Sequence, residues 1–182
     1  MADQKVTALS ENTTVATTDM LYLVDDPGGT PASEKATVAN VVLAGMVDIG
    51  AHVYNSGALS VVTATWTAMP ADSEYYDTDT IHSTVSNTSR LTATTAGKYW
   101  IWANVVFAAN ATGDRAASFD LNGGNVTWGT QRVGAFATSN CNLTPGVELD
   151  LAASDYVECR CRHSKGSNLD VTLLGFGMRR VG

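Results

Sequence analysis

The chain has 182 residues, a length that allows one ordinary domain with a short additional segment but not two full enzyme domains. Only 16% of the residues are charged, and the 23 threonines far outnumber the four lysines, a composition that favours strands over exposed helices. The formal net charge of −7 argues against binding to nucleic acid, because neutralising phosphates requires a basic surface.

The first 49 residues differ in pattern from the rest of the chain. An apolar run from Met20 to Val24 is followed by the turn-rich segment 25–31 and by a stretch, 36–44, whose valines recur at helical spacing. This segment has too few large apolar residues for a core of its own, so we expect an attachment arm, residues 1–49, that docks onto another copy, the second domain or a larger particle. The apolar side chains expected to make that contact are Leu21, Tyr22, Leu23, Val38, Val41 and Val42.

From residue 50 to residue 182 the pattern changes to short runs of two-residue alternation separated by turn clusters. This spacing is typical of an all-β antiparallel sandwich. The predicted strands are 51–54, 61–69, 89–94, 98–108, 116–121, 127–136, 141–151, 156–163 and 169–181.

Two of these strands are apolar on both faces. In the strand 98–108 one face is an ordinary core face, and the other carries Trp100, Trp102 and Val106. In the strand 169–181 the two faces would carry Leu169, Val171 and Leu173 on one side and Leu174, Phe176 and Met178 on the other. Such strands predict that the outer face of the sheet is covered, either by other copies of the chain or by its own N-terminal segment. The side chains predicted to hold the copies together are Trp100, Trp102, Phe176 and Met178.

Several short motifs of this second part occur in an order that resembles the jelly-roll family of tumour necrosis factor and of the globular heads of complement and collagen-like proteins. The motifs are Tyr76-Asp77-Thr78, Ser89-Arg90-Leu91-Thr92, Ala96-Gly97-Lys98-Tyr99-Trp100-Ile101-Trp102, the segment from Leu149 to Glu158, and Leu174-Gly175-Phe176-Gly177-Met178. The resemblance implies a jelly-roll sandwich in a compact homotrimer, with aromatic side chains around the threefold axis. The sequence departs from the animal members in having no collagen-like Gly-X-Y stalk and no signal peptide.

The N-terminal segment resembles the lead-in of many tailed-bacteriophage virion proteins. The residues that carry this resemblance are Asp19 to Asp25, Gly29-Thr30-Pro31 and Lys35 to Asn40. The two resemblances together imply a virion structural protein, assembled in the host cytoplasm and displayed on the particle surface. The arm would bind major capsid or tail proteins, and no membrane insertion is expected because no apolar run reaches about 18 residues.

Two roles fit such a trimer. As a capsid decoration or head fibre, it would be clamped to the capsid by its arm. As a tail-fibre or spike tip, it would bind a host-surface glycan or protein through exposed loops, for which Tyr75, Tyr76, Asn110 and Asp114 are the candidates. The composition does not separate the two roles.

The sequence carries little that is typical of an enzyme. The three histidines are far apart at positions 52, 82 and 163, and no His-Glu-x-x-His, Gly-x-Ser-x-Gly or phosphate-binding loop is present. We therefore expect no catalytic residue and no cofactor. A nucleophile pair of Cys161 with His163 is the one catalytic arrangement considered, and an acyl or glycan hydrolase that depends on His163 is the third functional alternative. The three cysteines, Cys141, Cys159 and Cys161, are expected to be free thiols on a buried face.

An acidic run, residues 72–79, is a weak candidate for a Ca²⁺ site. Asp77 and Asp79 could supply carboxylate oxygens to a hard cation. The run lacks the spacing and the central glycine of an EF-hand loop, so a solvated acidic loop is the competing interpretation.

Overall fold

The computed structural model describes residues 16, 18, 20–25, 32–37 and 48–181. The chain divides into two units, residues 1–47 and 48–182. In the first unit, strands β1 (Met20–Asp25) and β2 (Ala32–Thr37) pair as an antiparallel hairpin. The predicted apolar strand is therefore present at Leu21, Tyr22 and Leu23, whereas the predicted contact valines at positions 38, 41 and 42 lie outside the described residues.

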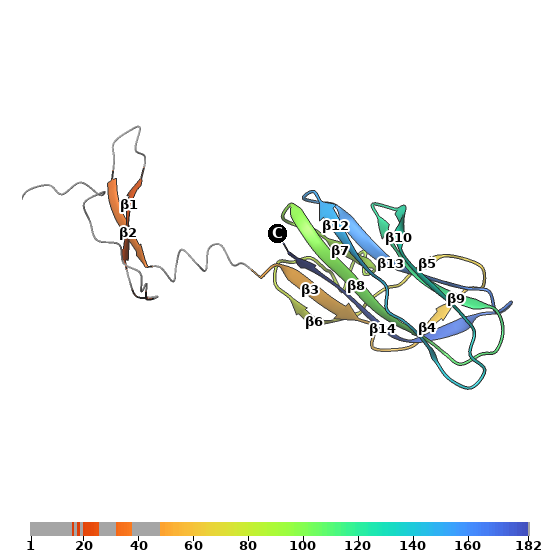
Figure 1. The fold of residues 1–182 in the computed structure, drawn as a ribbon. Coiled ribbons are helices and arrows are strands. Elements are labelled where there is room, and N and C mark those ends of the chain that lie inside the picture. The colour runs from red at the N-terminus through yellow and green to blue at the C-terminus, as the bar shows by residue number, and fades with distance from the viewer. Residues whose placement is uncertain (1–15, 17, 19, 26–31, 38–47, 182) are drawn as a thin grey trace, which may run out of the picture. The chain divides into compact units, whose positions relative to one another are not determined.

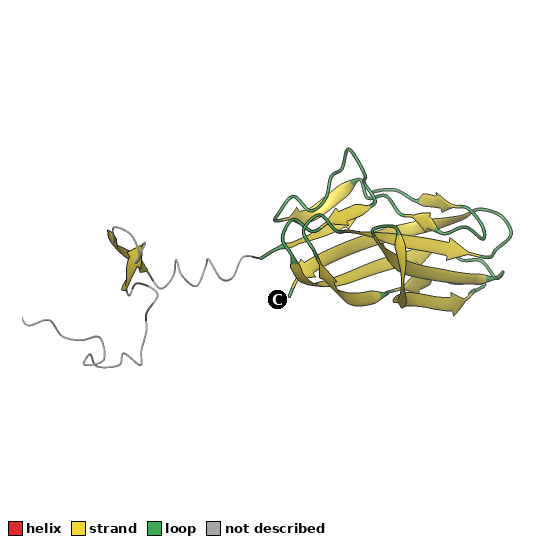
Figure 2. Cartoon of the chain, turned by 90° about the horizontal axis from the view of Figure 1, so that it is seen from above, coloured by secondary structure: helices red, strands yellow, loops and turns green. Residues whose placement is uncertain are grey.

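The second unit is built from strands joined by loops, and Figure 2 shows this arrangement from above. Its strands are β3 (Gly50–Tyr54), β4 (Leu59–Val61), β5 (Thr67–Ala68), β6 (Ser73–Asp77), β7 (Arg90–Thr92), β8 (Gly97–Phe107), β9 (Asp114–Leu121), β10 (Gly124–Gly134), β11 (Cys141–Leu143), β12 (Gly146–Leu151), β13 (Tyr156–His163) and β14 (Leu169–Arg180). Within the described residues, no helix has the length and apolar character needed to cross a membrane.

The strands form two antiparallel sheets that pack face to face (Figure 1). The five-stranded sheet has the order β10-β9-β13-β5, with β7 also paired to β13. The seven-stranded sheet has the order β11-β8-β14-β3-β6, with β12 also paired to β8 and β4 to β14. The predicted all-β antiparallel sandwich is confirmed.

Most predicted strands agree with the structure to within a few residues, but three segments differ. The predicted strand 61–69 is interrupted, so that its ends belong to β4 and β5 in different sheets. The predicted strand 141–151 is broken around Pro145 into β11 and β12, because proline has no N–H for the ladder. The acidic run is not a loop along its whole length, since residues 73–77 form β6.

The core lies between the two sheets and follows the alternation of the strands. The inward face of β8 carries Tyr99, Ile101, Ala103, Val105 and Phe107, each at most 3% exposed. The rings of Phe119 on β9 and Phe176 on β14 stack with centroids 6.0 Å apart and so join the two sheets. All three cysteines are free and buried, as predicted.

Strand β14 changes the direction of its side chains at a β-bulge. Val171 lies opposite Phe107 and Leu173 lies opposite Val106, so one extra residue enters β14 between these pairs. The extra residue reverses the alternation. Leu169 and Val171 therefore point inward on one side of the bulge, and Leu174, Phe176 and Met178 point inward on the other.

The bulge corrects the predicted set of interface residues. Phe176 is 1% exposed and Met178 is fully buried within a single chain, so neither is available to contact another copy. The strand appeared apolar on both faces only because a regular alternation was assumed across the bulge. Of the predicted set, Trp100 and Trp102 remain on the outer side.

Candidate functional site

The outer face of the seven-stranded sheet gathers aromatic side chains from three strands. We call this surface the aromatic face, and it consists of His52 and Tyr54 on β3, Tyr75 and Tyr76 on β6, and Trp100 and Trp102 on β8. Tyr75 is 66% exposed and Trp100 is 46% exposed, although both are large apolar groups. A single soluble chain rarely leaves so much connected aromatic surface in water.

Two glycines allow the tryptophans to lie across the neighbouring strands. A Cβ atom added at Gly177 on β14 would lie 2.4 Å from the Trp102 ring, and one at Gly146 on β12 would lie 2.7 Å from the Trp100 ring. Any larger residue at either position would therefore force the indole to move away from the sheet. The two rings consequently lie against the backbone at these glycines.

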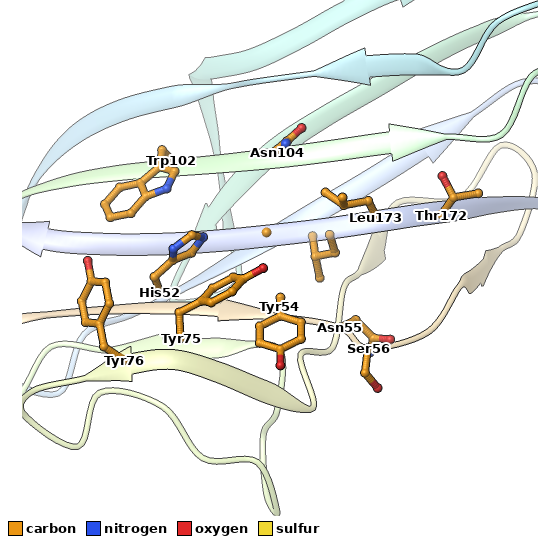
Figure 3. A pocket seen from close by; sticks show the side chains of 12 residues that line it. His52, Tyr54, Asn55, Ser56, Tyr75, Tyr76, Trp102, Asn104, Thr172 and Leu173 are labelled. Atoms are coloured by element: carbon orange, nitrogen blue, oxygen red, sulfur yellow. The ribbon is translucent and has the colours of Figure 1, made fainter.

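Two adjoining hollows occupy the aromatic face. The larger hollow has a volume of about 770 Å³, and its lining residues are His52, Tyr54, Asn55, Ser56, Tyr75, Tyr76, Trp102, Asn104, Thr172, Leu173, Leu174 and Gly175. Figure 3 shows the His52 ring between Trp102 and the two tyrosines of β6. The smaller hollow, about 550 Å³, is lined by Tyr76, Trp100, Trp102, Arg179 and Val181.

The polar groups of the larger hollow are only partly engaged. Asn55 donates from its side-chain amide to the Pro70 carbonyl at 3.1 Å, and the Ser56 hydroxyl donates to Asp72 at 2.6 Å. The Oδ1 atom of Asn104, in contrast, is buried without a hydrogen-bond partner. An occupant that donates a hydrogen bond would remove the cost of that buried acceptor.

The structure places the four predicted ligand-facing residues in two separate regions. Tyr75 and Tyr76 lie within β6 and not in a loop, because β6 pairs with β3 through a bulge near His52. Asn110 and Asp114 lie in and beside the β8–β9 connection, at the other end of the sheet's long strand.

Asn110 and Asp114 are engaged within the chain. The Arg115 guanidinium donates to the Asn110 carbonyl at 3.1 Å. The Asp114 carboxylate accepts a hydrogen bond from the Ser164 hydroxyl and pairs with Arg132 at 3.2 Å. The Ser164 hydrogen bond is the main cause that lowers the pKa of Asp114.

The carboxylate of Asp77 is hydrogen-bonded to the backbone of the loop that follows it. Its carboxylate accepts hydrogen bonds from the N–H groups of Asp79, Ile81 and His82 at 2.9 to 3.1 Å. Asp79 accepts a hydrogen bond from the Thr94 hydroxyl. Among the described residues no three His, Cys, Asp or Glu side chains are grouped so as to hold a metal ion.

His163 and Cys161 do not form a reactive pair. The Nε2–H of His163 donates to the Val61 carbonyl at 2.9 Å, and its Nδ1 accepts from the Lys165 N–H at 3.2 Å, the pattern of a neutral structural histidine. Burial and the neighbouring Cys159 raise the pKa of Cys161 well above its usual value, which disfavours the nucleophilic thiolate.

Sequence reasoning missed His52 and Tyr54 as members of the aromatic face. The sequence of the short strand 51–54 did indicate them. His52 and Tyr54, which both carry rings, alternate there with the small apolar residues Ala51 and Val53. It also missed the glycines beneath the indoles, which become visible only once the register of β8 against β12 and β14 is known.

The fold is similar to that of several jelly-roll domains of known structure. No family model matches the sequence, and no curated protein matches it. The globular domain of the zebrafish complement 1qA protein matches with a TM-score of 0.58 and 10% identity, over 74% of this chain and 98% of that one. Eiger TNF from S. frugiperda matches with a TM-score of 0.55 and 15% identity, over 75% and 94% of the two chains. Murine APRIL at pH 5.0 matches with a TM-score of 0.53 and 12% identity, over 74% and 99%. The jelly-roll fold predicted from the sequence is thereby confirmed.

Proposed function

We propose that this protein is a non-enzymatic, homotrimeric display domain that a tailed-phage virion carries on its surface as a capsid decoration or head fibre. The observation that carries the proposal is the aromatic face. Its two indole rings lie against glycines of the neighbouring strands, beside a hollow lined by tyrosines, and leaving this partly exposed aromatic surface in water is costly in free energy.

A second copy of the chain is the occupant that the fold favours for this face. The similar structures consist almost wholly of this one domain, which covers 94 to 99% of their length, and in the single chain the aromatic face is left exposed at Tyr75 and Trp100. The lining of the larger hollow contains neither a carboxylate nor an ammonium group, which suits an apolar contact between copies.

The virion part of the proposal depends on the first unit. The similar structures cover 74 to 75% of this chain, a share that matches the length of the second unit, and the motifs that resemble phage lead-in segments lie in residues 1–47. Leu21, Tyr22 and Leu23 belong to strand β1 of the β1–β2 hairpin. We propose that this unit binds major capsid or tail proteins, and that the protein is localised on the virion surface.

Two measurements test the two parts separately. Sedimentation equilibrium of the full chain should give the mass of three copies, and a monomer at micromolar concentration would contradict the trimer. Imaging virions labelled with an antibody against residues 51–182 should place the label over the capsid. Label on the tail alone would favour the alternative role as a receptor-binding fibre tip, and absence of label on every particle would contradict the virion role.

A further inference from the structure

His52 lies at the centre of the aromatic face, and its ring has no hydrogen-bond or ion-pair partner among the residues that the structure describes. Its ring centroid lies 4.7 Å from that of Tyr75, 5.8 Å from that of Trp102 and 6.3 Å from that of Tyr76. A Cβ atom added at Gly175 would lie 3.5 Å from its Nε2, so the ring also lies over β14. Figure 3 shows the imidazole surrounded by these rings.

The surroundings of His52 contain no acidic group that would balance a positive charge on it. From β6 it faces Tyr75 and Tyr76, and from β8 it faces Trp102 and Asn104. From β14 it faces glycines, and the nearby Arg179 is a cation that pairs with Asp48 at 3.1 Å. The other charged residues of β8 and β14 are Lys98, Asp170 and Arg180, and none of them lines the hollow around His52.

Two carboxylates of β6 are engaged elsewhere. Glu74 accepts a hydrogen bond from the ring of His82 at 2.8 Å, and Asp77 accepts hydrogen bonds from three backbone N–H groups. Neither lines the hollow around His52. A proton gained by His52 would therefore place an unpaired charge among aromatic rings beside a guanidinium.

We propose that His52 makes the contact between copies of the chain depend on pH, so that the trimer is stable at neutral pH and weakens on acidification. This proposal rests on the trimer proposed above. The neutral imidazole is compatible with a dry aromatic contact, whereas an imidazolium in each copy would be buried there without a counter-charge.

The direction of the effect follows from the free chain. Burial already lowers the pKa of His52 below its usual value of 6.5, and covering the face by another copy increases that burial. A lowered pKa means that the dissociated chain binds the proton more readily than the assembled chain. Assembly is therefore at full strength above the pKa of the dissociated chain, which lies below 6.5, and weakens as the pH falls from there through the further lowered pKa of the assembled chain.

The size of the effect depends on how far assembly lowers the pKa. Each unit of lowering corresponds to a tenfold preference per subunit for the dissociated state once the pH is well below the lowered pKa. Because a trimer contains three copies of His52, one unit per subunit would weaken the trimer dissociation constant by about a thousandfold.

Sedimentation equilibrium of the full chain at about pH 8 and in steps down to about pH 4.5 tests the proposal, with circular dichroism at each pH to show that the fold is retained. We expect wild type to be trimeric at the upper end of this range and to dissociate at its lower end. His52→Phe should remain trimeric throughout, because it keeps an aromatic ring and loses the titration. His52→Lys should dissociate throughout, because it carries the charge permanently. All variants retain His82 and His163, which controls for the other two histidines.

The outcomes separate the two proposals. A wild-type chain that is monomeric at about pH 8 overturns the trimer itself. A wild-type chain that is equally trimeric at every pH of the series leaves the trimer standing and overturns the role of His52. Equal acid-induced dissociation of wild type and His52→Phe would assign the effect to another group, and it also overturns the role of His52.

Discussion

Replacing Trp100 should dissociate the proposed trimer without unfolding the domain. Trp100 is 46% exposed in the single chain, so about 115 Å² of an indole of about 250 Å² remains to be buried by a second copy. At about 25 cal/mol per Å² this burial contributes up to about 3 kcal/mol per subunit, or about 9 kcal/mol per trimer. Because three chains associate, Trp100→Ala should raise the midpoint concentration for assembly by about a thousandfold.

Trp100→Asp is the stronger form of the same test, because it also places a charge in the contact. Sedimentation equilibrium across the micromolar range measures the assembly, and a thermal melt at low concentration measures the fold. The matched control is Val85→Asp, which changes an apolar side chain that is 90% exposed in a loop outside the aromatic face. A soluble Trp100→Asp variant that sediments as a trimer with the wild-type midpoint would refute the reasoning.

Three further predictions follow from other parts of the fold. Gly177→Ala should lift the Trp102 indole from the sheet, which would shift the tryptophan fluorescence and near-ultraviolet circular dichroism while costing about 1–2 kcal/mol of stability; an unchanged spectrum would contradict the close approach. Asp77→Ala should lower the free energy of unfolding by about 2 kcal/mol in denaturant melts, with or without Ca²⁺, because it leaves three backbone N–H groups without their acceptor. A stability loss seen only with Ca²⁺ present would instead revive the metal site. The three cysteines should resist iodoacetamide at about pH 8 until the chain unfolds, because all are buried; rapid native-state alkylation seen by mass spectrometry would contradict that placement.

The fold was largely predictable because the alternation of the strands survives in most of the sequence. In strand β8 the alternation correctly predicts both faces: the inward side chains form the core, and the outward side chains include the two tryptophans. The pattern misled at β14, where one extra residue at the bulge sends Phe176 and Met178 into the core. The extra residue of a bulge cannot be located from the sequence when the strand has apolar residues at consecutive positions, because no polar residue marks the change of face.

The candidate site was predictable only in part, because it depends on register between distant segments. Strand β6 was missed because an acidic, tyrosine-rich run has the composition of a solvated loop. Pairing with β3 is what brings Tyr75 beside His52. The sequence also gives no indication that Asp77 binds its own loop, since that contact requires the turn that follows β6.

The larger hollow lies where the hydrogen-bonded ladder of the sheet is interrupted on two adjacent strands. Strand β3 pairs with β14 from Gly175 onward and β4 pairs with it up to Val171, so residues 55–58 lie opposite the bulge. The two irregularities supply Asn55, Ser56 and residues 172–174 to the lining. The backbone thus shapes one end of the hollow, and exchanging the rings that line the rest of it leaves that end in place. Substitutions of the lining side chains would change which copies or partners this surface binds. An insertion or deletion in residues 55–58 would require a compensating change in residues 172–174, because the two segments lie opposite each other.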